Sequence, residues 1–214
     1  MTLRRFRELF FDATRDSFNP VRTVPIIMAA AIIMFAGTTA AQTAEEIVAR
    51  LSGFNEVIFD AGGVGTPPSA PALRGAISTP ASGKFQGIIN ENARTIDYEL
   101  SYEGLRAPVT QAHIHFGQRH TVGGIVVWLC QTSTNPAPAA VASLTPECPA
   151  EGTITGTITP AHVLAQTAQG FAAGDFDELD RAIHNGAAYA NVHTMMFTAG
   201  EIRGHIRVRR DGHR

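Results

Sequence analysis

Three histidines in this sequence have the spacing of metal ligands on β-strands. Side chains of a strand alternate between its two faces, so His113 and His115 would project from one face of segment 109–116. His193 holds the equivalent polar position in a second alternating segment, 189–194. Imidazole nitrogen suits Cu(II) and Zn(II), and copper binds more tightly at a given nitrogen site. If the two strands are neighbours, these residues would form a copper or zinc site.

The fourth position of such a site would be open or filled by His120, from the polar loop after the first histidine strand. A structural alternative needs no metal. In it, His113 and His193 hydrogen-bond to Asn191, Thr194 or the backbone and close one edge of the sheet. The sequence leaves both interpretations open.

The last predicted strand, 201–208, places Glu201, Arg203 and His205 on its outward face. Opposite charges two residues apart on one face predict a surface ion-pair ladder, which is worth a fraction of a kcal/mol. Cationic neighbours would discourage a metal at His205, so we expect this histidine to face solvent.

Cys130 and Cys148 are the two cysteines of the chain, and they flank a loop rich in Pro, Ala, Ser and Thr. In an exported chain this arrangement predicts a disulfide, which for a loop of this size stabilises by roughly 3 kcal/mol. The alternative is two reduced cysteines. Neither cysteine lies in a C-x-x-C pair, which argues against a zinc–cysteine site.

The N-terminal region has the layout of a secretory signal peptide. Residues 1–22 hold five arginines, residues 24–36 are apolar except for Pro25, and small residues follow at 37–41. This pattern predicts a signal peptide over 1–41 and an extracytoplasmic protein, whether periplasmic, secreted or at the cell surface. The apolar run is about 13 residues, whereas a spanning helix needs roughly 20. An uncleaved N-terminal anchor is the alternative.

The remaining chain reads as a linker at 42–49, a folded body at 50–208 and a charged tail at 209–214. Eight or nine short, turn-separated strands in the body predict an all-β, antiparallel, Greek-key-like sandwich with one or two short helices. Three local predictions are a helical turn within 43–50, a central strand in the apolar run 125–130, and a helix capped by Asp175 and Glu178.

Five ordered motifs of the body resemble the CHRD domain, which is named after chordin and also occurs alone in exported bacterial proteins. They are Leu51–Val57, Ile96–Leu105, Ala112–His115, Tyr189–Thr194 and Gly200–Ile206. Where the family usually ends its last motif with Gln, this chain has His205. The resemblance implies an extracytoplasmic β-sandwich. Over two residues, the His-x-His strand also resembles the copper ligands of copper/zinc superoxide dismutases.

The absence of familiar catalytic motifs favours a non-enzymatic protein. With a net charge of −2 the chain has no basic field for nucleic acid. We predict an exported binding or structural module with a protein or cell-envelope partner, membrane contact only through an uncleaved N-terminal segment, and self-association through edge strands. The alternative is a copper or zinc metalloprotein with superoxide-dismutase-like redox activity, in which Arg119 or Arg203 guides the anion.

Overall fold

The computed structural model describes residues 44–60 and 72–209. The predicted signal peptide or anchor over 1–41 therefore lies outside the described residues, as does the charged tail after Arg209. Within the described ranges, no helix is both long and apolar enough to cross a membrane.

The described chain consists of antiparallel strands, one α-helix and short 3-10 turns. The elements are β1 (Glu45–Ser52), β2 (Val57–Asp60), β3 (Ala72–Gly75), β4 (Ser82–Asn90), β5 (Thr95–Glu103), β6 (Val109–Phe116), β7 (Gly124–Cys130), β8 (Gly152–Ile158), α1 (Phe176–His184), β9 (Ala188–Thr194), β10 (Ile202–His205) and β11 (Arg207–Val208). The main sheet has the order β7-β6-β9-β10-β1-β4-β5-β8, with β11 beside β1, and β2 and β3 form a separate ribbon.

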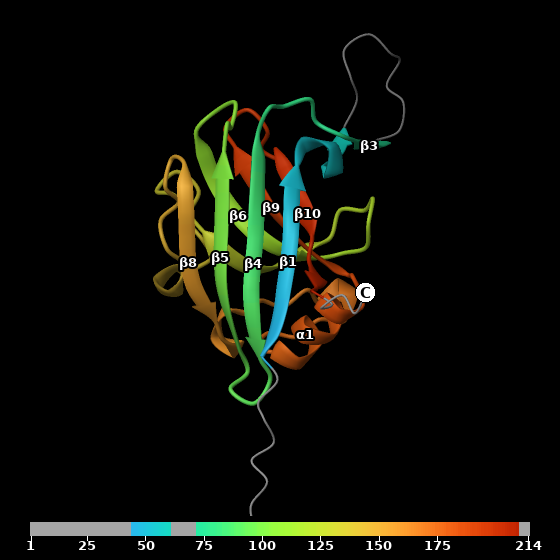
Figure 1. The fold of residues 1–214 in the computed structure, drawn as a ribbon, viewed down its shortest axis with the longest axis vertical. Helices are drawn as coiled ribbons and strands as arrows, with labels where there is room; N and C mark the ends of the chain where they lie inside the picture. Colours follow the sequence, from blue (N-terminus) through green and yellow to red (C-terminus); the bar gives the residue numbers. More distant parts are fainter. Residues whose placement is uncertain (1–43, 61–71, 210–214) are drawn as a thin grey trace, which may run out of the picture. The chain divides into compact units, whose positions relative to one another are not determined.

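The main sheet folds back on itself around the hydrophobic core. In Figure 1, β1, β4, β5 and β8 lie in front, and β6, β9 and β10 lie behind them. Strand β5 shows the alternation that produces this core, because Ile96, Leu100 and Tyr102 are buried and point inward. From the same face, Tyr98 donates a hydrogen bond of 3.0 Å to the carbonyl of Leu129 in β7. The prediction of an antiparallel β-sandwich is confirmed.

Strand β1 replaces the predicted linker and helical turn. It begins at Glu45 and pairs with β4 over its whole length, from Glu45 opposite Ile89 to Ser52 opposite Ser82. Ile47, Ala49 and Leu51 alternate along it and are buried. Burial of this period-two face outweighs the weak helix preference of the segment. The boundary predicted at residue 50 is thus too late.

Strand β7 is at one end of the sheet order, so the prediction of a central strand was wrong. Its outer edge is covered by the segment after β8. Leu164 donates its backbone N–H to the carbonyl of Val126 at 2.8 Å, and the Gln166 side chain donates to Ile125 O at 2.6 Å. This cover explains why an edge strand is continuously apolar.

Helix α1 has the predicted cap and ends at His184. The Asp175 carboxylate accepts the Glu178 backbone N–H at 3.0 Å. Phe176, Leu179 and Ile183 are buried on one side. The chain leaves the helix at Gly186, whose φ of +66° is readily adopted by glycine.

Cys130 and Cys148 form the predicted disulfide, which ties the end of β7 to a residue 18 positions later. We expect the reduced protein to lose about 3 kcal/mol of unfolding free energy, because the loop is no longer constrained in the unfolded chain. Urea unfolding with and without a thiol reductant measures the loss. A Cys130→Ser, Cys148→Ser variant should be as unstable as the reduced protein and insensitive to reductant; equal stability of all forms would contradict the prediction.

Candidate metal site

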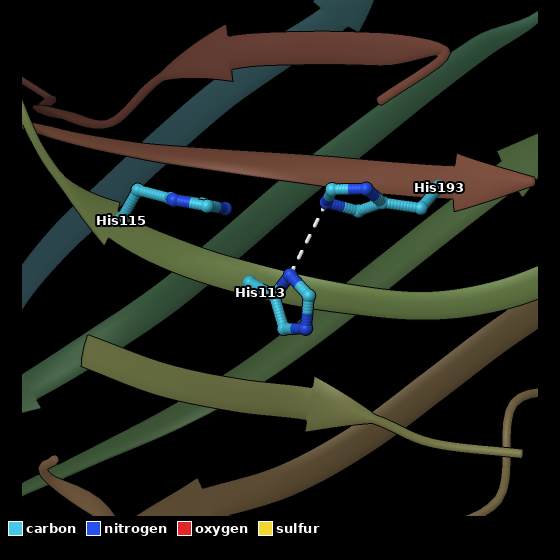
Figure 2. A group of neighbouring side chains, drawn as sticks. All are labelled: His113, His115 and His193. Carbon is cyan, nitrogen blue, oxygen red and sulfur yellow. Dashed lines mark hydrogen bonds between the residues drawn. The ribbon is translucent and has the colours of Figure 1, made fainter. Parts of the chain in front are cut away.

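The three predicted ligand histidines come together on neighbouring antiparallel strands. In the β6–β9 pair, His113 lies opposite Asn191, and His193 lies opposite Gln111. Ring centroids are 4.8 Å apart for His113 and His193, 5.4 Å for His113 and His115, and 6.2 Å for His115 and His193. Figure 2 shows His113 and His193 facing each other, with His115 beside them.

The histidines occupy the face of the sheet that points away from the hydrophobic core. Their neighbours Ala112, Ile114 and Val192 alternate with them and belong to that core. Yet the exposed fractions of His113, His115 and His193 are only 0%, 6% and 5%. The molecule therefore has a second, polar buried layer on the outside of this part of the sheet.

Two of the rings have their tautomers fixed by backbone carbonyls. Nδ1 of His115 lies 2.9 Å from the carbonyl oxygen of Gly123, and Nδ1 of His193 lies 2.9 Å from that of Thr198. A carbonyl oxygen can only accept, so each Nδ1 carries a proton and donates it, which leaves each Nε2 with a free lone pair. Metal-binding histidines characteristically have this arrangement.

His113 bridges the pair. Its Nδ1 lies 3.2 Å from Nε2 of His193, which as an acceptor requires a proton on His113 Nδ1. Nε2 of His113 and Nε2 of His115 are buried without a hydrogen-bond partner among the described residues. The other side of the His113 ring packs edge-to-face on half-buried Trp128, with centroids 4.3 Å apart.

All three imidazoles are neutral at neutral pH, the form that binds a metal. Burial lowers the pKa of His115 and of His193 to about 4. Burial, together with the two neighbouring histidines, lowers the pKa of His113 well below its usual range. One candidate ligand nitrogen from each ring lies within 4.8 Å of the other two. Tetrahedral nitrogen ligands about 2 Å from a metal are roughly 3.3 Å apart, so small side-chain adjustments suffice.

His120 is not brought to this cluster. Its side chain is exposed on the loop between β6 and β7, and the group of mutually close ligand atoms consists of the other three histidines. The prediction of His120 as a fourth ligand is therefore wrong for this structure: the loop turns at His120, with φ of +62°, and its side chain stays in solvent.

Glu201 and Arg203 do not form the predicted surface ion-pair ladder, because their exposed fractions are 0% and 1%. Glu201 accepts hydrogen bonds from the Thr79 hydroxyl at 2.6 Å, the Thr194 hydroxyl at 2.9 Å and the Arg106 backbone N–H at 3.0 Å. The outer face of β10 is covered by loops, which alternation along one strand cannot show.

Arg203 contacts the three-histidine cluster through Tyr189. Its guanidinium lies 3.4 Å from the centroid of the Tyr189 ring, and that ring stacks on His115 with centroids 4.7 Å apart. Arg203 also donates hydrogen bonds to the carbonyls of Thr121 at 2.7 Å and Gln118 at 3.2 Å. It thereby fastens the β6–β7 loop, whose Gly123 carbonyl orients His115.

His205 lies beside Arg203 and is half-buried, so the expectation of a solvent-facing side chain was wrong. Its Nε2 is 3.2 Å from Nη2 of Arg203, and as the acceptor of that N–H it must be unprotonated. Burial and the adjacent guanidinium lower the pKa of His205 to about 4. This orientation leaves it outside the three-histidine cluster.

Glu56 is a site residue that sequence reasoning missed. It follows the 3-10 turn after β1, is 2% exposed, and borders the polar layer. Burial raises the pKa of its carboxyl to about 7, against the Val57 N–H and the Arg203 charge, which lower it. Its neighbours Asn55 and Val57 gave no sign of this position, because only the fold brings the turn against β9 and β10.

A family model described as the CHRD domain matches residues 47–206. Because the match covers most of the chain, the protein belongs to the CHRD domain family. The search of curated proteins and the search of solved structures gave no match.

Proposed function

We propose that this CHRD domain is an exported, non-enzymatic module that holds one copper or zinc ion at His113, His115 and His193. The observation that carries the proposal is the convergence of three neutral imidazoles from two strands, two of them oriented by backbone carbonyls. Imidazole nitrogens without protons attract a divalent transition metal, and the unpartnered Nε2 of His115 would gain a partner.

The burial of the three rings supports a structural metal. Structural zinc sites are closed by protein ligands, whereas catalytic sites keep a position open to water or substrate. Here the rings are covered, and the Arg203 guanidinium, a candidate guide for superoxide, is engaged by Tyr189 and two carbonyls. The ion would join β6 to β9 and steady the loops above them.

Export and partner binding complete the proposal. The Cys130–Cys148 disulfide fits an oxidising compartment. The sequence before β1 has the layout of a signal peptide or anchor. In the proposed role, the metal-stiffened sandwich binds a protein or cell-envelope partner, or a second copy through an edge strand, and has no nucleic-acid ligand.

Metal binding predicts a large thermal shift. At a free Cu(II) or Zn(II) concentration of 100 times the dissociation constant, we expect stabilisation of about 2.7 kcal/mol, because the ion binds the folded chain. Differential scanning calorimetry with and without metal measures the shift, and elemental analysis after dialysis should find about one ion per chain.

His113→Ala, His115→Ala double replacement should abolish the shift, whereas His120→Ala should retain it, because His120 is exposed and outside the cluster. An equal shift in the double variant, or no bound metal in the wild type, would refute the proposal. The copper-loaded protein should not consume superoxide; turnover that is lost in the double variant would instead identify a redox enzyme.

A further inference from the structure

Asn191 is a buried polar residue whose side chain contacts the three-histidine cluster. It is buried, lies on β9 directly opposite His113, and places its Oδ1 3.0 Å from Nε2 of His193. Nδ1 of His193 already donates to Thr198, so Nε2 of the neutral ring has no proton to offer this oxygen.

The centre of the cluster therefore has more acceptors than donors. The acceptors are Nε2 of His115, Nε2 of His193 and Oδ1 of Asn191, and the one donor described among them is Nδ1–H of His113. Buried lone pairs that face one another without a proton are unfavourable. A cation at this position would neutralise the surplus and take the place of the Nδ1 proton of His113. The neutral ring would then carry its proton on the unpartnered Nε2.

Glu56 explains why the Asn191 amide is turned with its oxygen toward the histidines. Oε2 of Glu56 is buried without a hydrogen-bond partner of its own among the described residues. A Cβ on Gly200 would come within 2.6 Å of this oxygen and 2.8 Å of Asn191 Nδ2, so the carboxyl and the amide nitrogen meet at the same glycine. The amide N–H₂ thus faces the carboxyl, because an N–H group is attracted to a carboxyl oxygen.

Gly200 makes this approach of Glu56 to Asn191 feasible. Its φ of +126° is in the region that favours glycine, and any side chain there would strike both polar groups. Three segments therefore pack together around the Asn191 amide: the turn after β1, strand β9 and the loop between β9 and β10.

We propose that Asn191 is the fourth ligand of the metal, through its amide oxygen, and that Glu56 is the positioning residue that holds the amide in this orientation. This inference rests on the proposed function. It gives a closed set of three imidazole nitrogens and one oxygen, without a sulfur ligand, which suits Zn(II) or Cu(II) better than Cu(I). Replacement of a residue that hydrogen-bonds to a metal ligand typically lowers metal affinity by about 10- to 100-fold.

The test compares metal affinity in full-length variants by competition with a chelator, using Zn(II) and Cu(II). Asn191→Leu, which has a similar shape but no oxygen to bind the metal, should lower metal affinity at least tenfold. Asn191→Asp, which keeps an oxygen, should bind at least as tightly as the wild type. Glu56→Gln should weaken binding roughly tenfold, because its amide no longer fixes the orientation of Asn191.

Cu(II) electron paramagnetic resonance adds a readout that a purely structural role would not change. The Asn191→Leu spectrum should show an altered ligand field with the same nitrogen couplings. Gln86→Leu is the matched control: it also replaces an amide by leucine, but on β4, where Gln86 bonds to Glu99. It should keep wild-type affinity and spectrum.

The outcomes separate the two proposals. If the wild type binds metal and Asn191→Leu binds it equally well with an unchanged spectrum, the fourth-ligand assignment is wrong and the three-histidine site stands. Unchanged affinity in Glu56→Gln overturns the positioning role. If the wild type binds no metal, both proposals fall. Should Asn191→Leu fail to fold, Asn191→Asp still decides through its Cu(II) spectrum. Exchange of an amide oxygen for a carboxylate oxygen must change the spectrum if residue 191 is a ligand, so an unchanged spectrum contradicts the assignment.

Discussion

Replacement of Arg203 by leucine is expected to lower the free energy of unfolding by about 3 to 5 kcal/mol. Arg203 is 1% exposed, and its guanidinium donates to the carbonyls of Gln118 and Thr121, which would be left without these donors. Leucine would also lose the contact with the face of the Tyr189 ring. Denaturant unfolding of the metal-free protein measures the loss.

Arg207→Leu provides the matched control, because Arg207 lies four residues further along and is exposed. Its replacement should change stability by no more than about 0.5 kcal/mol. The Arg203→Leu variant should also bind metal more weakly, since the loop that orients His115 is loosened. Equal stability of the two variants would show that Arg203 is not required for the buried layer.

Acidification from pH 7 to pH 4 is expected to remove several kcal/mol of stability from the metal-free protein. His115 and His193 have pKa values of about 4 in the folded chain and 6.5 as free groups. Between pH 6.5 and pH 4, these histidines are therefore protonated in the unfolded chain but remain neutral in the folded chain. Stability is complete above pH 6.5 and falls as the pH approaches 4, by on the order of 3 kcal/mol for each of these two histidines.

Glu56 opposes this trend over part of the range. Its folded pKa of about 7 lies above the free value of 4.5, so its contribution is complete below pH 4.5 and is lost as the pH rises through 7. More histidines destabilise the protein in acid than this one carboxyl can offset, because the pKa values of His113 and His205 are lowered as well. The net effect of acid is therefore destabilising.

Denaturant unfolding at a series of pH values in a chelator measures this dependence. His115→Gln should flatten the curve between pH 6.5 and pH 4 by up to one proton, because glutamine does not titrate. A stability that does not vary over this range would mean that the three rings are accessible to protons in the folded state.

Local patterns predicted much of the fold correctly. The alternation in 109–116 and 189–194 identified two strands, and Asp175 with Glu178 identified the start of a helix. These succeeded because a strand face and a helix cap are decided within a few residues. Residues 45–50 and 125–130 were misjudged for the opposite reason. Whether a short apolar segment is a helix, an edge strand or a central strand depends on what packs against it.

The candidate site shows the same division. The period of two placed His113 and His115 on one face and gave His193 the matching phase. It could not show that β6 and β9 are neighbours across a separation of 80 residues, nor that loops would cover their outer face. Glu201 and Arg203 were assigned to solvent for that reason.

The sequence by itself determined which side chains share a strand face, which two cysteines could pair and where the helix begins, since each depends on neighbouring residues or on a lack of alternatives. Only the tertiary structure decided that the polar face is buried and that Glu56 and Asn191 meet at Gly200. Burial is a property of the segments that cover a surface, and here those segments come from distant parts of the chain.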